Sequence, residues 1–260
     1  MVAASIVGGL AVYMCIAFGI ALVRKDNGIA DVAYGGALIV CAWSSSILGT
    51  PSVLGTVLTA LVTLWGMRLM IRIARKNWGK PEDFRYRAWR ESWGQWFVLR
   101  SFFQIYMLQG AIAAIIVLPV TAVNLYGASA HILSITTGVV LWAIGFLFEV
   151  IADSQLDSFL RNPENKGKLM QYGLWNYSRH PNYFGESMMW WAIAFLAIVA
   201  LTPSFQVLAF LLLSSPVLIT WLLLRVSGIP MLEKKMAAHP DWSLYAARTN
   251  AFIPWFPKKS

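Results

Sequence analysis

The stretch SRHPNYFGESMMWWAIAFLAIVAL, residues 178–201, joins a polar segment directly to an apolar one. Its second part, residues 187–201, contains no charged side chain and suits the interior of a bilayer. Its first part places Arg179, His180, Asn182 and Glu186 at the entrance to that segment. Because ionisable side chains at membrane depth are costly and usually functional, this junction predicts both a membrane fold and a site.

The rest of the chain also indicates a membrane protein. Of its 260 residues, 58% are hydrophobic and only 13% are charged, which is too few charges for a soluble protein of this length. We therefore predict an all-α polytopic membrane protein, one membrane domain over residues 1–260, with seven transmembrane helices. The short sixth span is separated from the seventh by Thr202, Pro203 and Ser204. The expected spans are residues 2–23, 29–48, 53–71, 97–118, 132–151, 187–201 and 207–224.

The positive charges predict how the chain is oriented. All 21 Lys and Arg residues lie in, or beside, the loops that follow the first, third, fifth and seventh spans. The alternate loops, near residues 49–52, 121–131 and 202–206, contain none. By the positive-inside rule, the N-terminus is expected outside and the C-terminus in the cytoplasm.

The net charge of +9 raises the question of an anionic partner. Cations that line a membrane surface favour anionic lipids, and no nucleic-acid recognition module is present, so we expect no nucleic-acid partner. Three histidines, His131, His180 and His239, are too scattered to predict a metal site. Cys15 and Cys41 both lie in apolar runs and are expected to be buried thiols.

Acidic residues at the end of the fifth expected span form a stripe. Glu149, Asp153 and Asp157 are spaced by four and therefore share one helix face. Like charges repel, so the stripe needs either cationic partners or a ligand rich in hydrogen-bond donors. The alternative is a solvated helix end, but Glu149 follows the apolar run LWAIGFLF and is expected below the surface.

Further polar residues lie near the ends of the second and third expected spans. Asp31 and Tyr34 fall on about the same face of the second span, where Asp31 is either a site residue or a carboxylate favoured by the helix dipole. Arg68 and Arg72 are one turn apart and serve either a site or the lipid headgroups. The loop at residues 75–93 interleaves Arg with Trp and Tyr, as a phosphate-bearing ligand or an anionic lipid surface requires.

The polar part of the opening stretch predicts a ligand site. Asn182 and Glu186 lie on one face of the incoming helix, and together they offer a donor and strong acceptors. Amides and ribose hydroxyls match these groups, while Arg179 and His180 suit phosphate. Pro181 is typical of a first helical residue, and the alternative is a helix cap with an aromatic belt.

Four segments carry a resemblance to a known family. GLWNYSRHPNYFGE (173–186), KDNGIADVAYG (25–35), LWGMRL (64–69) and YAARTNAFIPWFP (245–257) together resemble the bacterial branch of the steroid 5α-reductase family. The RHPxYxG core also occurs in isoprenylcysteine carboxyl and phospholipid methyltransferases, which use S-adenosylmethionine. The Asn-x-x-x-Glu form with Glu-x-x-x-Asp on the fifth span is similar to the NADPH-using reductases.

The resemblance implies a membrane reductase with seven helices in a bacterial inner membrane. NADPH would lie among the helices, held mostly by residues of the C-terminal half (about 130–260), and no Rossmann motif is present. A lipophilic enone, such as a 3-oxo-Δ4-steroid, would enter from the bilayer and accept hydride at its β-carbon. The residues that the resemblance assigns to the cofactor are Glu149, Asp153, Arg161, Tyr172, Arg179, His180, Asn182, Tyr183 and Glu186.

The chain departs from the family's substrate-binding pattern. Steroid-reducing relatives carry a Gln-Glu pair on the second helix and a Tyr on the third, whereas this chain offers Asp31, Tyr34 and Trp65. Because hydride delivery builds negative charge on the carbonyl oxygen, a donor is needed there. We expect Asp31, protonated through burial, with Tyr34 or Trp65 to be the catalytic group. A methyltransferase and a non-catalytic sterol-binding protein are the two alternatives.

Overall fold

The computed structural model describes residues 1–128, 130–201 and 206–258, and every regular element within these ranges is a helix. No β-strand occurs within these ranges. The chain forms two compact units. Unit 1 comprises Met1–Ala130 and Ala197–Leu212, and unit 2 comprises His131–Leu196 and Leu213–Ser260.

The prediction of a seven-span, all-α membrane protein is confirmed. In the described part of the chain, seven helical segments are long and apolar enough to cross a membrane. They are Val2–Arg24, Ile29–Leu48, Val53–Asn77, Phe84–Ile116, Ile132–Arg161, Pro181–Leu201 and Phe210–Met236.

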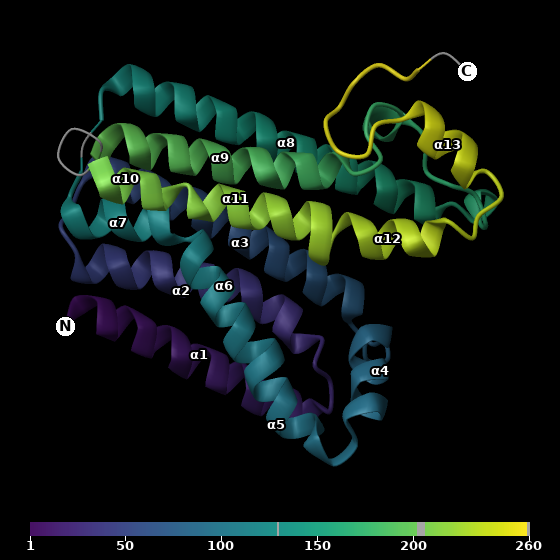
Figure 1. The fold of residues 1–260 in the computed structure, drawn as a ribbon, viewed down its shortest axis with the longest axis horizontal. Helices are drawn as coiled ribbons and strands as arrows, with labels where there is room; N and C mark the ends of the chain where they lie inside the picture. The colour runs from purple at the N-terminus through teal and green to yellow at the C-terminus, as the bar shows by residue number, and fades with distance from the viewer. Residues whose placement is uncertain (129, 202–205, 259–260) are drawn as a thin grey trace. The chain divides into compact units, whose positions relative to one another are not determined.

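Unit 1 begins with three helices that lie side by side in Figure 1: α1 (Val2–Arg24), α2 (Ile29–Leu48) and α3 (Val53–Asn77). Helices α2 and α3 approach closely because both have glycine where they meet. A Cβ on Gly35 would lie 2.8 Å from the Gly66 carbonyl oxygen, and one on Gly66 would lie 2.9 Å from the Gly35 carbonyl oxygen. Small residues of this kind let helix backbones pack closely in a membrane.

The second half of unit 1 is more broken. Helix α4 (Phe84–Trp93) runs steeply to α1–α3 in Figure 1. A 3-10 turn (Gly94–Trp96), α5 (Phe97–Ser101), a π-helical segment (Phe102–Met107) and α6 (Leu108–Ile116) follow it. Helix α7 (Leu118–Tyr126) is fixed by Asn124, whose amide nitrogen lies 3.0–3.1 Å from oxygens of Ala42, Ser45 and Thr59. Unit 1 also contains α10 (Gln206–Leu212).

Unit 2 contains α8 (Ile132–Arg161), most of α9 (Pro181–Leu201), α11 (Ser214–Trp221), α12 (Ile229–Met236) and α13 (Trp242–Arg248). Short 3-10 turns at Pro163–Asn165 and Gly173–Asn176 lie between α8 and α9. A π-helical segment, Leu222–Val226, separates α11 from α12. Helices α8 and α9 again meet at glycines, because a Cβ on Gly185 would lie within 2.4 Å of the Gly145 carbonyl oxygen.

Several expected boundaries differ from the structure. The third and fifth spans continue past residues 71 and 151, because Arg, Lys, Gln and Leu are good helix formers and no Pro or Gly stops them. The sixth span begins at Pro181 rather than at residue 187, so residues 181–186 of the polar motif are helical. The fourth is interrupted after Ile116, and part of the loop expected at residues 121–131 is helix α7. Thr202, Pro203 and Ser204 lie outside the described residues.

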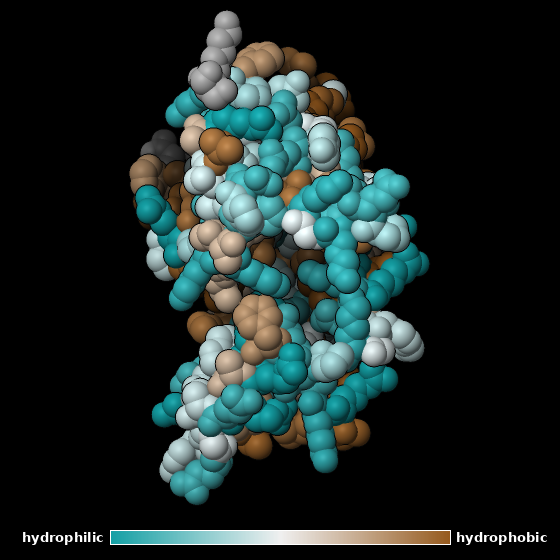
Figure 2. Space-filling model, turned by 90° about the vertical axis from the view of Figure 1, so that its right-hand side faces the viewer, coloured by the Kyte–Doolittle hydropathy of each residue, from teal (hydrophilic) through white to brown (hydrophobic). Residues whose placement is uncertain are grey.

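Figure 2 shows a face on which hydrophilic side chains are numerous. Cys41 is buried as expected, but Cys15 is exposed on α1, because the helix turns that residue away from its neighbours. Both thiols are free.

Candidate functional site

The crossing of α8 and α9 determines where the acidic stripe lies. A Cβ on Gly185 would lie 2.7 Å from the backbone nitrogen of Glu149, so the two helices touch at the depth of this acid. Glu149 and Asp153 are only 4% and 5% exposed, whereas Asp157, one turn later, is half-buried. The stripe is therefore not a solvated helix end, because its first two carboxyl groups are buried.

Asn182 faces this stripe from the first turn of α9. Its amide nitrogen donates to Asp153 Oδ1 at 3.2 Å. Its amide oxygen is buried and accepts no hydrogen bond from any residue that the structure describes. Because a buried acceptor without a donor is costly, this oxygen marks a place where a donor from a ligand would be favoured. Tyr183 and Glu186 are half-buried on the same helix.

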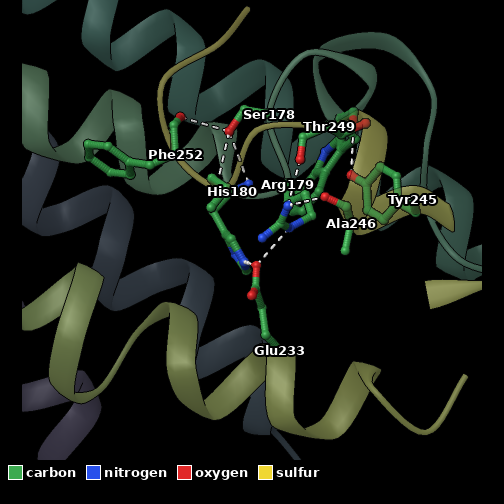
Figure 3. Close-up of polar contacts among 10 residues, drawn as sticks. Ser178, Arg179, His180, Glu233, Tyr245, Ala246, Thr249 and Phe252 are labelled. Atoms are coloured by element: carbon green, nitrogen blue, oxygen red, sulfur yellow. Dashed lines mark hydrogen bonds and ion pairs between the residues drawn. The ribbon is translucent and has the colours of Figure 1, made fainter. Parts of the chain in front are cut away.

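Arg179 and His180 point to a different part of unit 2. The Arg179 Nε lies 2.8 Å from Glu233 Oε1 on α12, and its Nη1 donates to the carbonyl oxygens of Ala246 (3.0 Å) and Thr249 (2.5 Å). The His180 ring is 1% exposed and reaches the same Glu233 oxygen at 3.2 Å (Figure 3). It also stacks on Tyr183, with ring centroids 5.5 Å apart.

The residues around this pair hold the C-terminal segment in place. Ser178 Oγ donates to the carbonyl oxygen of Phe252 at 2.8 Å, and the Arg179 backbone nitrogen donates to that of Asn250 at 2.8 Å. The Tyr245 hydroxyl, whose pKa is raised by burial, donates to the Trp175 carbonyl oxygen at 2.6 Å. The motif at residues 178–186 is therefore divided: its start secures α12 and the C-terminal segment, and its end faces the acids.

A cavity of about 430 Å³ lies beside the stripe, farther along α8. Trp175 and Leu174 attach the 3-10 turn to α8, through the Ala152 carbonyl oxygen (2.9 Å) and the Gln155 side chain (2.9 Å). The lining combines hydroxyl and amide side chains with apolar and aromatic ones. Its lining residues are Ser154, Gln155, Ser158, Phe159, Met170, Tyr172 and Gly173. Tyr172, one of the residues predicted to bind the cofactor, is therefore part of this cavity. Arg161, another of them, is exposed at the end of α8.

In unit 1, Asp31 is held by two residues of α4. Its Oδ2 lies 2.7 Å from Arg85 Nη2, and its Oδ1 accepts from the Tyr86 hydroxyl at 2.6 Å. Both carboxylate oxygens therefore act as acceptors, whereas we had expected a protonated donor. The reason is that α4 brings two donors, the Arg85 guanidinium and the Tyr86 hydroxyl, to the two carboxylate oxygens.

Tyr34 and Trp65, the other two expected catalytic residues, flank the glycine crossing of α2 and α3. Tyr34 is half-buried and Trp65 is 2% exposed.

The loop at residues 75–93 was expected to offer cations to a phosphate or an anionic lipid. Two of these cations, Arg85 and Arg90, each form an ion pair with an acid of the same chain. Arg90 Nη2 lies 2.8 Å from Glu82 Oε1.

Sequence reasoning missed Glu233, Arg85 and Tyr86 as individual residues. Arg85 belongs to a loop in which cations and aromatic residues alternate, so no single position stood out. Glu233 lies in MLEKKM, where its neighbours indicate only a polar helix end. Each makes its contact with a residue more than fifty positions away, and spacing along the chain carries no signal of that kind.

Comparisons with known proteins identify a family. A model described as "Protein of unknown function (DUF1295)" matches residues 17–249. A probable O-methyltransferase, ustE of Ustilaginoidea virens, is 39% identical over 49 residues, which are 19% of this chain and 17% of that protein. The match covers less than a fifth of that relative's length. No solved structure matches this chain. Because the family model covers most of the sequence, the chain belongs to the DUF1295 family of membrane-type helical proteins.

Proposed function

We propose that this protein is a membrane reductase that uses NADPH to reduce the carbon–carbon double bond of a lipophilic enone, such as a 3-oxo-Δ4-steroid. One observation carries the proposal: the buried amide oxygen of Asn182 has no donor in the described chain, and it lies beside the buried carboxyl group of Asp153. A ligand with N–H and O–H groups would supply the missing donor.

The residues present fit NADPH in chemical type. Its carboxamide and ribose hydroxyls need acceptors, which Asn182, Glu186, Glu149 and Asp153 offer. Its phosphates need cations, and Arg161 is exposed at the end of α8. When bound, NADPH would supply the hydride for the β-carbon of the enone. This is the activity type of a 3-oxo-5α-steroid 4-dehydrogenase.

The chain's own residues would orient the ligand rather than react with it. Asp153 fixes the amide plane of Asn182 through the 3.2 Å bond, so the free oxygen points in one direction. Glu233 holds His180, and His180 stacks on Tyr183, so the ring of Tyr183 has a fixed position. Arg179 and His180 would therefore position the first turn of α9, which carries Asn182 and Tyr183, in addition to lining the cofactor site.

The proposal includes a place and an orientation. The acids would lie on the cytoplasmic side of a bacterial inner membrane, where NADPH is available, and the substrate would arrive through the lipid. Asp31, Tyr34 and Trp65 would serve the substrate end, and no metal or nucleic acid is required.

A methyltransferase that uses S-adenosylmethionine is the second candidate. The observation that favours it is the 49-residue likeness to a protein named as a probable O-methyltransferase. S-adenosylmethionine also carries ribose hydroxyls and a positive charge that suit the acidic stripe, but it has no phosphate for Arg161. A non-catalytic sterol-binding protein would require neither cofactor.

Binding of NADPH and of S-adenosylmethionine to the purified protein in detergent tests the proposal. We expect NADPH to bind and Asn182→Ala to weaken it by about tenfold, the effect of losing a hydrogen bond of about 1.4 kcal/mol. Ser187→Ala is the control, because Ser187 lies on the same helix but bonds Thr220 at 2.7 Å instead of the acids. Binding of S-adenosylmethionine alone would reverse the assignment.

A further inference from the structure

The C-terminal segment, residues 250–258, follows α13 and is not helical, but its backbone is fixed to unit 2. Two of its carbonyl oxygens accept from the Ser178 hydroxyl and the Arg179 backbone nitrogen, both at 2.8 Å. The Trp255 backbone nitrogen donates to the Tyr177 carbonyl oxygen at 3.0 Å. Because these bonds hold both the start and the middle of the segment, the fold sets the directions of its side chains.

The segment turns apolar and aromatic side chains outward. Ile253, Trp255 and Phe256 are 62%, 66% and 74% exposed, and the exposed Lys258 follows them. Water disfavours a group of three large apolar side chains, and such an exposed group marks an interaction surface. The boundary of a bilayer accepts this combination, because aromatic rings lie among the headgroups there and a lysine ammonium meets phosphate.

An aromatic row within unit 2 shows where the segment lies along the membrane-spanning helices. Phe252 packs against Phe184, near the start of α9, with ring centroids 5.8 Å apart. Phe184 packs in turn against Phe148 of α8 at 5.6 Å. Next to Phe148 on the fifth span, Leu147 and Ile151 are exposed, as side chains that face lipid are. The segment therefore continues the lipid-facing surface of α8 at the level where the apolar part of α9 begins.

We propose that the C-terminal segment is a membrane anchor, which inserts Ile253, Trp255 and Phe256 into the headgroup layer nearest the start of α9. Lys258 pairs there with the phosphate of anionic phospholipids. The anchor holds residues 177–179, to which the segment is bonded, at a constant depth directly before α9. This inference needs only that α8 and α9 cross a membrane, and it does not depend on the proposed function.

Fluorescence quenching by spin-labelled lipids tests the contact. The full-length protein is labelled with the fluorophore NBD at Phe256→Cys and placed in nanodiscs of phosphatidylcholine and phosphatidylglycerol. Cys15→Ser removes the exposed native thiol, and Cys41 is buried. We expect strong quenching by lipid that carries its spin label near the headgroup, and weaker quenching by lipid labelled near the end of the acyl chain, because the segment lies in the headgroup layer.

Glu164→Cys, labelled in the same way, is the matched control. Glu164 is exposed in the 3-10 turn after α8, and the ten helical residues beyond Ile151 carry that turn about 15 Å farther along the helix axis. Its label should not be quenched by either lipid. An unquenched label at position 256, or equal quenching at both positions, overturns the proposal. A second copy of the chain that covered the segment would shield the label and give the first of these results.

The charge of the lipid is tested with a further variant of the labelled protein. Lys258→Gln should lower the ratio of quenched to unquenched label about fivefold when phosphatidylglycerol is present, the effect of one cation near an anionic surface. It should change little in phosphatidylcholine alone. The same response to Lys258→Gln in both lipids overturns the role given to anionic phospholipid.

Hydrogen exchange of the unlabelled protein in nanodiscs tests whether the anchor holds the turn. The combined variant Trp255→Ser and Phe256→Ser should lose protection at the Arg179 amide, which donates to the segment. Leu160→Ser is the control, because Leu160 is 69% exposed at the end of α8 that lies beyond the apolar span. Equal protection of the Arg179 amide in the wild type and the combined variant overturns the anchoring role.

Discussion

Asn27 in unit 1 and Asn182 in unit 2 both lie near the start of a helix, but they differ in whether the side-chain amide oxygen has a donor. Asn27, just before α2, donates from its amide nitrogen to Ser101 at 3.1 Å, and its amide oxygen accepts from the Tyr106 hydroxyl at 3.4 Å. Asn182, at the start of α9, donates to Asp153 at 3.2 Å, but its buried oxygen has no donor in the described chain. Each belongs to a unit in which two helices meet at glycines, α2 and α3 in unit 1 and α8 and α9 in unit 2.

The difference separates a structural group from a candidate binding group. In unit 1 the asparagine is satisfied on both sides, and it joins α5 and the π-helical segment to the start of α2. In unit 2 the same side chain leaves one acceptor inside the protein unused. A stable fold rarely retains such an atom without a use, because the loss costs about 1–3 kcal/mol.

The first prediction has an all-or-none outcome and concerns the side of the membrane. Both asparagines are expected on the cytoplasmic side, so a cysteine at Ser92, in unit 1, or at Asn165, in unit 2, should not label from outside intact cells. A cysteine at the exposed Thr50 should label. A membrane-impermeant maleimide measures this, and labelling at Ser92 would reverse the predicted orientation.

The second prediction concerns the glycine crossings. Gly185→Ala should lower stability by about 3 kcal/mol, because its Cβ would meet the backbone of α8 and force the helices apart. Gly66→Ala, with 2.9 Å to the Gly35 carbonyl oxygen, should cost less. Gly8→Ala, which has nothing within 4 Å, is the control and should be neutral or stabilising. Thermal melts in detergent rank the three variants. Equal melting temperatures for Gly185→Ala and Gly8→Ala would contradict the close contact of α8 and α9 at Gly185.

The third prediction tests whether Asn182 and Glu186 act on one ligand. Glu186→Gln replaces a charged acceptor by an amide and should weaken NADPH binding by about ten- to a hundredfold. Combined with Asn182→Ala, the two losses should sum to less than their separate values, because neighbours on a shared ligand are coupled. Titration of NADPH into the single and double variants measures this. Unchanged affinity with earlier melting would show a helix cap instead.

The fourth prediction contrasts the two asparagines by stability. Asn27→Ala should cost about 2 kcal/mol, because it leaves the buried Ser101 and Tyr106 hydroxyls without their partner. Asn182→Ala should cost less than about 1 kcal/mol, since it also removes an unsatisfied oxygen. Denaturant or thermal unfolding without ligand measures both. A larger loss for Asn182→Ala would remove the distinction between the two groups.

The smallest expected effect concerns pH and the start of α4. Burial raises the pKa of Asp83, but hydrogen bonds and charge from Arg85 outweigh it and hold the pKa below its ordinary value. The charged Asp83 carboxylate therefore contributes its full stabilisation of the folded state above the unfolded-state pKa, about 3.9. This contribution is lost as the pH falls from there through the lower folded-state pKa. The protection factors of the amides in residues 83–93, which correct for the intrinsic pH dependence of exchange, should fall below about pH 4 in the wild type. Asp83→Asn should flatten this response, because Asn also caps helices.

Local patterns in the sequence were sufficient for the outline of the site. The four-residue spacing of Glu149 and Asp153 predicted a shared helix face, and the structure buries both side chains. Pro181 predicted a helix start, and α9 begins there. The roles assigned to these residues stay predictions. The pairing of Arg179 and His180 with Glu233 could not be predicted, because it joins segments about fifty residues apart.

By itself, the sequence determined the class and the spans: apolar runs of bilayer length, with every cation in alternate loops, leave few alternatives to a polytopic helical protein. Only the tertiary structure decided which polar groups are already satisfied. Asp31 changed from an expected donor to an acceptor because α4 brings Arg85 to 2.7 Å. Asn182 kept an unused oxygen because, among the residues that the structure describes, Asp153 alone bonds its amide. Hydropathy depends on residue type alone, whereas a hydrogen bond depends on distance and direction between residues that only the folded chain brings together.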